Sequence, residues 1–327
     1  MMQAFLESAH DEGDDNRVVK VWVKQVRDVA YDVEDTLQEF AVRLEKQSWW
    51  RIRRNLLDRR RVAKQMKDLR ANVEDISQRN TRYNIIKGPG SKPAITHGQF
   101  QVAGTTLSGV DEAIRNVLMR SYDGLPYHLK SCFLYIPIFP EDYKVGQGRL
   151  TRRWSVEGYS REVHGRPAEE IADNYFMELI SRSMILPSQQ SIHSIKGIDS
   201  CQVHDLIREI GVSKSMEENL VFTLEEGCSS NSQVMVRHLS ISSNGKGDKS
   251  EFESIVDMSR LRSITWFGEW KSFFISHRMR FLRVLDLEDT TCLLDHQLKN
   301  IGKLLHLRYL SLRDVWIFPT FQIRWVT

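Results

Sequence analysis

The sequence predicts a multidomain, mainly α-helical protein in which a helical bundle comes first and an α/β repeat array comes last. Two observations lead to this fold class. Apolar residues recur with helical spacing near the N-terminus, and a short leucine-rich unit is copied near the C-terminus. The 327 residues exceed a usual single domain, and 41% of them are hydrophobic, which suffices for several cores. The net charge of +3 requires neither nucleic acid nor an anionic membrane as a partner.

Residues 17–45 carry the clearest helical pattern. Their apolar side chains lie three or four positions apart and draw one stripe: Trp22, Val26, Val29, Val33, Leu37, Phe40 and Leu44. A second stripe with the same spacing follows: Val62, Met66, Leu69, Val73 and Ile76. Two such stripes must be buried, which predicts a helical bundle. The Gly- and Pro-rich residues 88–93 end this segment.

Two charged features lie within the predicted bundle. One is a group of arginines beside Trp49 and Trp50: Arg51, Arg53, Arg54, Arg59, Arg60 and Arg61. We favour a solvated basic helix over a phosphate-binding face for this group. The other is the acidic cluster Asp32, Glu34 and Asp35, which has no histidine nearby. We expect it on an exposed helix face, where it would contact protein and not act in catalysis.

Residues 21–40, VWVKQVRDVAYDVEDTLQEF, resemble the third helix of the Rx-type coiled-coil domain of plant CC-NB-ARC-LRR (NLR) disease-resistance proteins. Glu34 and Asp35 fall on that family's acidic "EDVID" motif, and Gln38 replaces its last acid. In that family the motif docks against the repeat domain. The resemblance therefore implies a contact role for Asp32, Glu34 and Asp35.

That family resemblance implies that a nucleotide-binding domain should follow the bundle. Its P-loop, G-x-x-x-x-G-K-[ST], cradles phosphates and holds Mg²⁺. The nearest match, from Gly104 to Gly109, is followed by Val110 and Asp111, which supply neither the lysine nor the hydroxyl. We therefore predict no ADP, ATP or Mg²⁺ cofactor, no ATP hydrolysis and no catalytic residue. The four cysteines are scattered and predict neither a metal site nor a disulfide framework.

A second long resemblance begins at Cys132. The run CFLYIPIFPED, residues 132–142, matches the "CFLYxxxFPED" signature of the winged-helix domain in the same family. Helical and strand patterns predict the following elements: helices at 125–136, 149–157 and 168–181, and strands at 184–186 and 201–203. In the third helix we expect Ile171, Tyr175 and Leu179 on one face.

Val203, His204 and Asp205 fall on that family's "MHD" motif, whose histidine reaches the β-phosphate of bound ADP. We interpret His204 as a vestigial nucleotide position, since the rest of the nucleotide cage is missing. We expect Asp205 to open the helix that follows and to cap it.

A winged helix also raises nucleic-acid binding as an alternative function. In that case Arg149, Arg152 and Arg153 would line a recognition helix. Trp154 within the same segment favours a packing helix instead, so nucleic acid is not the partner that we expect.

Internal repeats begin after residue 230. The pattern apolar-x-x-apolar-x-apolar occurs four times, at Val236-Leu239-Ile241, Leu261-Ile264-Trp266, Leu282-Leu285-Leu287 and Leu307-Leu310-Leu312. The copies start 25, 21 and 25 residues apart, which is typical of leucine-rich repeats. Each copy predicts a short strand, and the array predicts a solenoid. Polar side chains of the strand face offer either a binding surface or a solvated face: His238, Arg262, Arg283, Asp286, Arg308 and Arg313.

These patterns predict the following division: an incomplete Rx-type domain at 1–86, a linker at 87–110 in place of the nucleotide-binding domain, a winged helix at 111–230 and truncated repeats at 231–327. We expect the Rx-type domain to lack its first helix, since Met1 falls inside the second. The resemblance implies plant innate immunity, with recognition of a pathogen effector or a guarded host protein and a hypersensitive response.

Without a nucleotide core we expect this chain to act through protein contacts with such ligands, with other NLRs or with its own repeats, and do not expect it to oligomerise. The expected location is cytoplasmic, with peripheral plasma-membrane association as an alternative. Two other functions stay open. One is an ADP-dependent switch, if a nucleotide-binding exon is missing from the sequence around 87–110, and the other is a winged-helix nucleic-acid binder.

Overall fold

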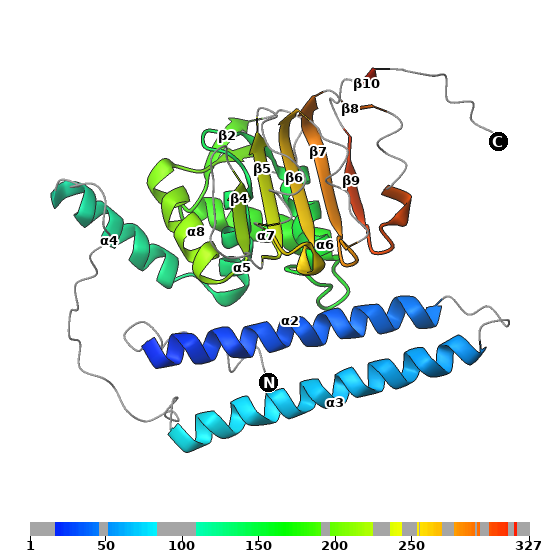
Figure 1. The fold of residues 1–327 in the computed structure, drawn as a ribbon. Helices are drawn as coiled ribbons and strands as arrows, with labels where there is room; N and C mark the ends of the chain where they lie inside the picture. The colour runs from blue at the N-terminus through cyan, green and yellow to red at the C-terminus, as the bar shows by residue number, and fades with distance from the viewer. Residues whose placement is uncertain are drawn as a thin grey trace. The chain divides into compact units, whose positions relative to one another are not determined.

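A computed structural model describes residues 17–45, 52–83, 109–190, 197–224, 236–243, 254, 256–269, 278–291, 293–294, 301–312 and 317–318 (Figure 1). The chain divides into two compact units, Met1–Thr106 and Leu107–Thr327. Several features of the sequence lie outside the described residues: Trp49, Trp50, Arg51, the segment 84–108, Arg313 and the C-terminal residues 319–327.

The first unit contains an antiparallel pair of long helices, α2 (Arg17–Glu45) and α3 (Ile52–Tyr83) (Figure 1). Both predicted helices are confirmed. Trp22 is buried, and its indole Nε1 donates a hydrogen bond to the Ile76 carbonyl at 3.1 Å. The stripes are not buried along their whole length, because Leu37 and Val73 are 48% and 41% exposed.

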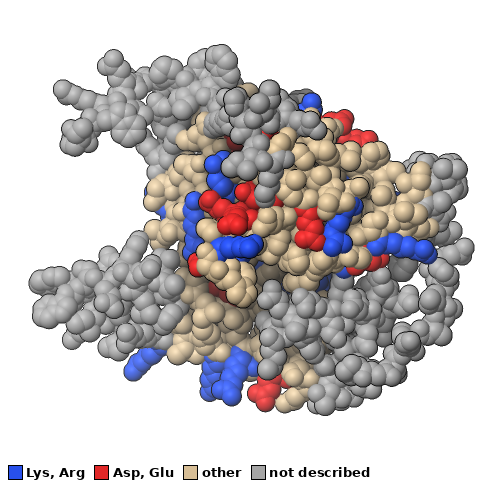
Figure 2. All heavy atoms as spheres, turned by 180° about the vertical axis from the view of Figure 1, so that it is seen from behind, with Lys and Arg blue, Asp and Glu red and all other residues tan. Residues whose placement is uncertain are grey.

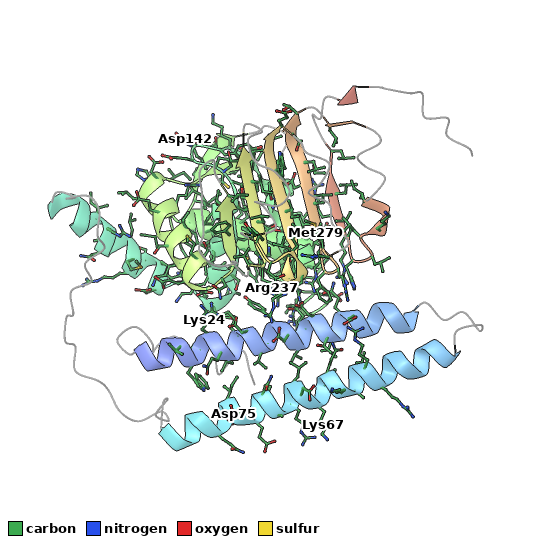
Figure 3. All side chains as sticks on the ribbon, viewed as in Figure 1. Lys24, Lys67, Asp75, Asp142, Arg237 and Met279 are labelled. Carbon is green, nitrogen blue, oxygen red and sulfur yellow. The ribbon has the colours of Figure 1, made fainter. Side chains whose placement is uncertain are left out.

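The basic group on α3 behaves as a solvated face where its side chains are described. Arg60 and Arg61 are exposed, as are Lys67 and Asp75 further along the helix (Figure 3). Acids thus alternate with bases on this helix, which favours the solvated interpretation over a phosphate-binding face.

The second unit begins with α-helices, a short 3₁₀-helix and a small sheet. Their bounds are α4 (Gly109–Asp123), α5 (Tyr127–Tyr135), the short 3₁₀-helix η2 (Ile136–Ile138), α6 (Gln147–Glu157), α7 (Ala168–Ser181) and α8 (Asp205–Glu217). The antiparallel sheet has the order β1-β3-β2, formed by β1 (Val145–Gly146), β2 (Leu186–Gln190) and β3 (Ile198–Gln202). The predicted helices are confirmed, with α7 at the predicted bounds. The two predicted strands overlap β2 and β3, which begin two residues later and three residues earlier than expected.

A single apolar cluster holds these helices together. Cys132, Phe133, Leu150 and Trp154 belong to it, and each is at most 1% exposed. On α7 the buried residues are Ala172, Phe176 and Leu179, while Ile171 and Tyr175 are half-buried. The predicted face of α7 was therefore wrong by about one position, because Ala172 and Phe176 lie one residue beyond the two positions we expected.

The repeats form a five-stranded parallel sheet in the order β4-β5-β6-β7-β9 (Figure 1). Its strands are β4 (Val221–Leu224), β5 (His238–Ser243), β6 (Ser263–Glu269), β7 (Val284–Thr291) and β9 (Tyr309–Ser311). The copies stand side by side in register, with Leu239 beside Ile264, Ile264 beside Leu285 and Leu285 beside Leu310. β4 belongs to no copy of the motif and precedes the predicted boundary at residue 230.

Successive side chains of each strand point to opposite faces of this sheet. The leucine-type positions of the first three copies form a second buried core, whereas Leu310 in the last strand is 43% exposed. At the alternate positions, Ser240, Thr265 and Asp286 are buried polar side chains, and Arg153 of α6 donates hydrogen bonds to the last two. The 3₁₀-turn η3 (Met258–Arg260) and the short parallel strands β8 (Leu293–Leu294) and β10 (Ile317–Phe318) complete the described part.

Within the described ranges no helix has the length and apolar content that a membrane span needs. The same residues contain no group of three or more His, Cys, Asp or Glu side chains suited to a metal ion.

Candidate functional site

His204 lies at the N-cap of α8 and is exposed. Its Nδ1 accepts a hydrogen bond from the Leu206 backbone N–H at 3.4 Å, which is long for such a bond. Asp205, which we expected to be the cap, is instead the first residue of the helix. Its negative charge there interacts favourably with the positive end of the helix dipole. The predicted start of the helix is confirmed, and the predicted cap was wrong by one residue.

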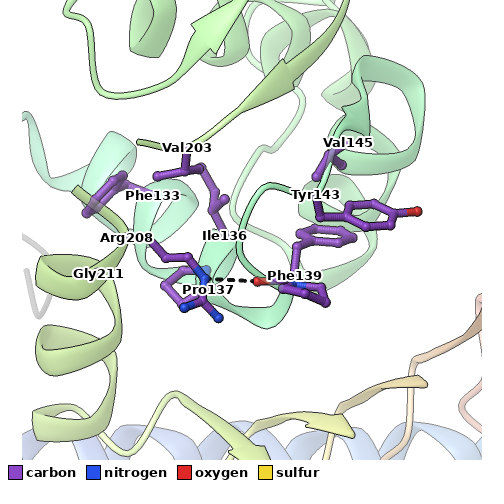
Figure 4. A pocket seen from close by; sticks show the side chains of 10 residues that line it. Phe133, Ile136, Pro137, Phe139, Tyr143, Val145, Val203, Arg208 and Gly211 are labelled. Carbon is purple, nitrogen blue, oxygen red and sulfur yellow. Dashed lines mark hydrogen bonds between the residues drawn. The ribbon is translucent and has the colours of Figure 1, made fainter. Parts of the chain in front are cut away.

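A small cavity lies beside Val203, between α5, η2 and α8 (Figure 4). Its lining is mostly apolar: Phe133, Ile136, Pro137, Phe139, Pro140, Tyr143, Val145, Val203, Arg208 and Gly211. Arg208 donates from Nε to the Phe139 carbonyl at 3.3 Å. The volume of about 10 Å³ suits about one water molecule, so this cavity does not fit a nucleotide.

The acidic cluster of the first unit lies on α2. Glu34 is exposed, Asp32 is half-buried and Asp35 is 7% exposed. The expected exposed face was therefore wrong for Asp35. The contact role of these three carboxylates stays a prediction, because it depends on a partner surface.

The most developed polar site is formed by α6 and the repeat sheet. Two of the arginines that we considered for nucleic-acid binding, Arg149 and Arg153, meet Asp286 of β7. Arg149 pairs with both carboxylate oxygens, from Nε at 2.8 Å and from Nη2 at 2.9 Å, and Arg153 Nη1 lies 2.7 Å from Oδ2. Arg149 is 5% exposed, and the other two residues are fully buried. We call these three residues the Arg–Asp–Arg cluster.

The two arginines of this cluster lower the pKa of the Asp286 carboxyl. Burial raises the pKa of Asp286, but the positive charges of Arg153 and Arg149 outweigh burial and hold that pKa below its usual value. Burial also disfavours the charged form of Arg153, and Tyr135 and Asp286 compensate, so the guanidinium pKa stays above its usual range. All three groups are therefore charged at neutral pH.

Aromatic rings of the CFLYIPIFPED run surround the two guanidinium groups. Arg153 lies over the rings of Tyr135 and Phe139 at 5.1 and 5.0 Å, and Arg149 lies 5.3 Å from the centre of Phe139. Tyr143 packs against Phe139 and donates from its hydroxyl to Asp289 at 2.8 Å. The signature run thus supplies both core residues and a wall for buried cations.

A second set of polar side chains surrounds His238 of β5. Its Nε2 lies 2.6 Å from the Tyr159 hydroxyl, its Nδ1 lies 3.0 Å from Ser263 Oγ, and Glu157 Oε1 lies 3.6 Å from Nδ1. Burial lowers the pKa of His238 well below its usual value, and the arginines nearby, first Arg153, act in the same direction. The imidazole is therefore neutral in the folded protein.

These contacts change two of the sequence-based expectations. The nucleic-acid alternative loses its recognition helix, since Arg149 and Arg153 are buried and only Arg152 of the three is exposed. On the face shown in Figure 2, acidic and basic side chains of the second unit are interleaved and do not form one large basic patch. Of the predicted strand-face residues, His238, Arg262, Arg283 and Asp286 are at most 6% exposed and so are not available to a partner, whereas Arg308 is exposed.

A column of arginines marks the start of the strands. Each member directly precedes a strand, and each backbone N–H after the first donates to the carbonyl of the previous arginine at 2.7–2.8 Å: Arg237, Arg262, Arg283 and Arg308. Arg237 lies at this end of the sheet (Figure 3). We call these four residues the arginine column, and the recurring Arg of LRSITW, LRVLDL and LRYLSL was its signal in the sequence.

Sequence reasoning missed the residues that join α6 to the sheet. Tyr135, Tyr143, Glu157 and Tyr159 were not singled out. Tyr135 had a signal in the signature run, but the other three have no periodicity or spacing that distinguishes them from surface residues.

Three segments match known families in the order of the predicted domains. Residues 1–70 match the Rx N-terminal domain, residues 138–210 the disease resistance protein winged helix domain and residues 260–319 a leucine-rich repeat region.

Relatives include disease resistance protein Pik-2 of Oryza sativa subsp. japonica, 36% identical over 214 residues, which are 64% of this chain. Disease resistance protein PIK6-NP of the same organism is 35% identical over 62% of this chain, and probable disease resistance protein RXW24L of Arabidopsis thaliana is 33% identical over 63% of it. The matched part spans 19–24% of the length of these relatives. The chain belongs to the plant disease-resistance proteins that carry an Rx-type N-terminal domain, a winged helix and leucine-rich repeats.

Proposed function

We propose that this chain acts in plant innate immunity as a receptor-like protein that works through protein–protein contacts. The observation that supports the proposal best is the ordered match to three domains of disease-resistance proteins. The chain spans about a fifth to a quarter of its relatives, so the activity of a whole receptor does not follow from these matches alone.

The proposed partners are full-length relatives, a pathogen effector or a guarded host protein, and the chain's own repeats, in the cytoplasm or peripherally at the plasma membrane. The repeats would form a short solenoid that presents part of the binding surface. The sequence lacks the lysine and the hydroxyl of a P-loop, and the cavity near Val203 is too small for a nucleotide. We therefore propose that the chain does not run an ADP/ATP cycle, with His204 and Asp205 as a vestigial nucleotide position.

The acidic cluster on α2 is the proposed contact element of the first unit. Asp32, Glu34 and Asp35 bring three carboxylates within one helical turn. The complementary surface that we propose is the repeat domain of a full-length relative, because the resemblance implies that this motif docks against repeats.

The test is co-expression in leaf cells of the tagged chain with a tagged full-length relative. We expect co-purification of the two proteins, loss of co-purification in the Asp32→Lys, Glu34→Lys, Asp35→Lys variant, and no cell death with the chain alone. The matched control is Asp75→Lys, which reverses an exposed carboxylate on α3.

Two results would contradict the proposal. Cell death caused by the chain alone would show autonomous signalling. Binding of ADP by the purified chain in calorimetry, at micromolar affinity, would restore the ADP-dependent switch as the function.

A further inference from the structure

We propose that the outer side of α4 is a docking surface for the nucleotide-binding domain of a full-length relative. Ile114 and Val117 lie on one side of this helix and are 42% and 62% exposed, and we call these two residues the α4 ridge. In the sequence Val110 precedes them, which gives the i, i+4, i+7 spacing of a helix that inserts into a groove of another protein. The inference rests on the proposed function, because it names a surface by which the chain contacts its relatives.

The opposite side of α4 is already covered by the protein itself. Leu118 and Met119 pack against the apolar cluster of the second unit, and Tyr122 belongs to that cluster and is 1% exposed. A helix with apolar residues on more than one side is typical of a helix that is buried on more than one side. The inner side of α4 is thus buried, whereas the α4 ridge is open to solvent.

The second unit presents the α4 ridge on a helix that is already formed. Arg115 Nη1 lies 3.9 Å from Glu209 Oε2 of α8, next to the apolar contacts of the inner side. Beyond this point the N-terminal end of α4 projects from the other helices of the second unit (Figure 1). A side chain on a formed helix loses less conformational freedom on binding than one on an unfolded segment, so the α4 ridge is suited to contact a second body.

The position of α4 in the chain indicates which body this is. The helix begins at Gly109, at the end of residues 87–110, which take the place of the nucleotide-binding domain that the family resemblance implies. Consecutive parts of a chain are usually adjacent in space, so in a full-length relative this domain is the neighbour that we expect for the corresponding helix. In this chain the same surface is open and available to the nucleotide-binding domain of another molecule.

A second copy of this chain is a less suitable occupant. Pairing of two α4 helices would cover only the two ridge residues of each copy, which is far less apolar area than stable dimers bury. A domain with a groove encloses the ridge from several sides and buries more of it.

The experiment identifies the occupant by photo-crosslinking. In the purified full chain Val117 is replaced by p-benzoylphenylalanine, the protein is mixed with the purified full-length relative Pik-2 and irradiated, and the crosslinked peptides are identified by mass spectrometry. We expect crosslinks to the part of that relative between its Rx-type domain and its winged helix. Crosslinks to the relative's repeats, to a second copy of this chain or to residues 84–108 of the chain itself would overturn the proposal, as would the absence of crosslinks.

A pair of variants measures how much the α4 ridge contributes to binding. Ile114→Asp, Val117→Asp should weaken the affinity for the relative at least about tenfold in biolayer interferometry, because charged residues replace apolar contacts at the centre of the interface. Both residues are exposed, so we expect an unchanged circular dichroism spectrum. The matched control is Asn116→Asp, Arg120→Asp, which adds negative charge at exposed positions on other sides of the same helix and should keep the affinity.

The outcomes separate this inference from the proposed function. Unchanged affinity of Ile114→Asp, Val117→Asp, together with loss of binding when Asp32, Glu34 and Asp35 are changed to Lys, would overturn the inference and leave the proposed function intact. Equal losses in the ridge variant and its control would also overturn the inference, because charge and not the apolar ridge would then decide binding. If the unchanged chain does not bind the relative at all, the proposed function fails as well.

Discussion

At the residue scale, the contact between α6 and the sheet depends on the hydrogen-bond and ion-pair partners of each buried polar group. His238 is 1% exposed and bonds through both ring nitrogens, to Tyr159 and to Ser263. Other charged or titratable groups face the ring: Glu157, Tyr135, Arg153, Arg237, Arg262 and Arg283. The arginines disfavour a second positive charge, so protonation of this imidazole opposes the folded state.

The stability of the protein should therefore depend on the protonation of His238. The pKa of His238 is lowered in the folded state, so below about pH 6.5 the unfolded chain binds a proton that the folded chain does not. The free energy of unfolding should fall with decreasing pH by up to about 1.4 kcal/mol per pH unit from this residue. In His238→Gln, which keeps a polar side chain, urea unfolding between about pH 5 and pH 6.5 should show a smaller slope.

An exposed histidine provides the control for this measurement. His164→Asn changes an exposed side chain at a turn with positive φ, which Asn tolerates. We expect that variant to keep the wild-type slope. Equal slopes for His238→Gln and the wild type would show that His238 does not contribute to the pH dependence.

At the scale of elements, local sequence patterns predicted the helices and the repeated strands, because these elements depend mainly on residues close in sequence. The helix at 17–45 appears at the predicted bounds because its apolar stripe is long. The helix at 168–181 also appears at its predicted bounds, although its buried face is displaced by one position. Copies of one unit fold alike, and the copies stand in register in the sheet. β4 could not be predicted, because Val221–Leu224 is short, belongs to no copy and becomes a strand by pairing with β5. The cap of α8 was misplaced by one residue, because Asp is normally a much better cap than His.

Helix α8 approaches η2 closely at one glycine. A Cβ atom at Gly211 would lie 2.9 Å from Pro137 Cγ and 3.5 Å from Phe133 Cζ, and the proline ring cannot move away easily. Alanine in a helix is otherwise favoured over glycine by about 1 kcal/mol. We expect overpacking to prevail, so that Gly211→Ala lowers the free energy of unfolding by about 1–3 kcal/mol in urea titrations.

The matched control lies in another helix of the same unit. A Cβ atom at Gly148 of α6 would meet only the flexible end of Arg152, at 3.6 Å. Gly148→Ala should therefore leave the stability unchanged or raise it by up to about 1 kcal/mol. If both variants gained stability equally, the approach of α8 to Pro137 would be looser than the geometry implies.

At the scale of the whole molecule, the winged helix and the repeats share structure that a division by motifs does not reveal. The predicted boundary at residue 230 follows the motifs, whereas β4, which follows α8 directly, is the first strand of the repeat sheet. The Arg–Asp–Arg cluster is a second attachment, more than 130 residues apart in sequence. Such long-range pairs could not be predicted, because a polar strand position looks the same whether water or another domain covers it.

These two attachments predict that the winged helix and the repeats unfold together. Each part has a fully buried tryptophan, Trp154 in α6 and Trp266 in β6. With 5-fluorotryptophan incorporated into the full chain, the ¹⁹F signals of these two residues should lose their native positions at one common midpoint temperature. The physical reason is that unfolding of either part alone would leave Arg153 or Asp286 without its buried partner and expose the polar face of the sheet.

Trp22 provides an internal reference for this measurement, since it lies in the other unit and bonds to Ile76 within that unit. Its midpoint is free to differ from that of the other two. Separate midpoints for Trp154 and Trp266 would mean that the repeats unfold independently. The contact through Asp286 would then be too weak to make one cooperative unit of the two domains. Because one transition requires the buried contact to persist up to the midpoint, the ¹⁹F signals measure directly whether these repeats are an independent module or part of the winged-helix domain's own fold.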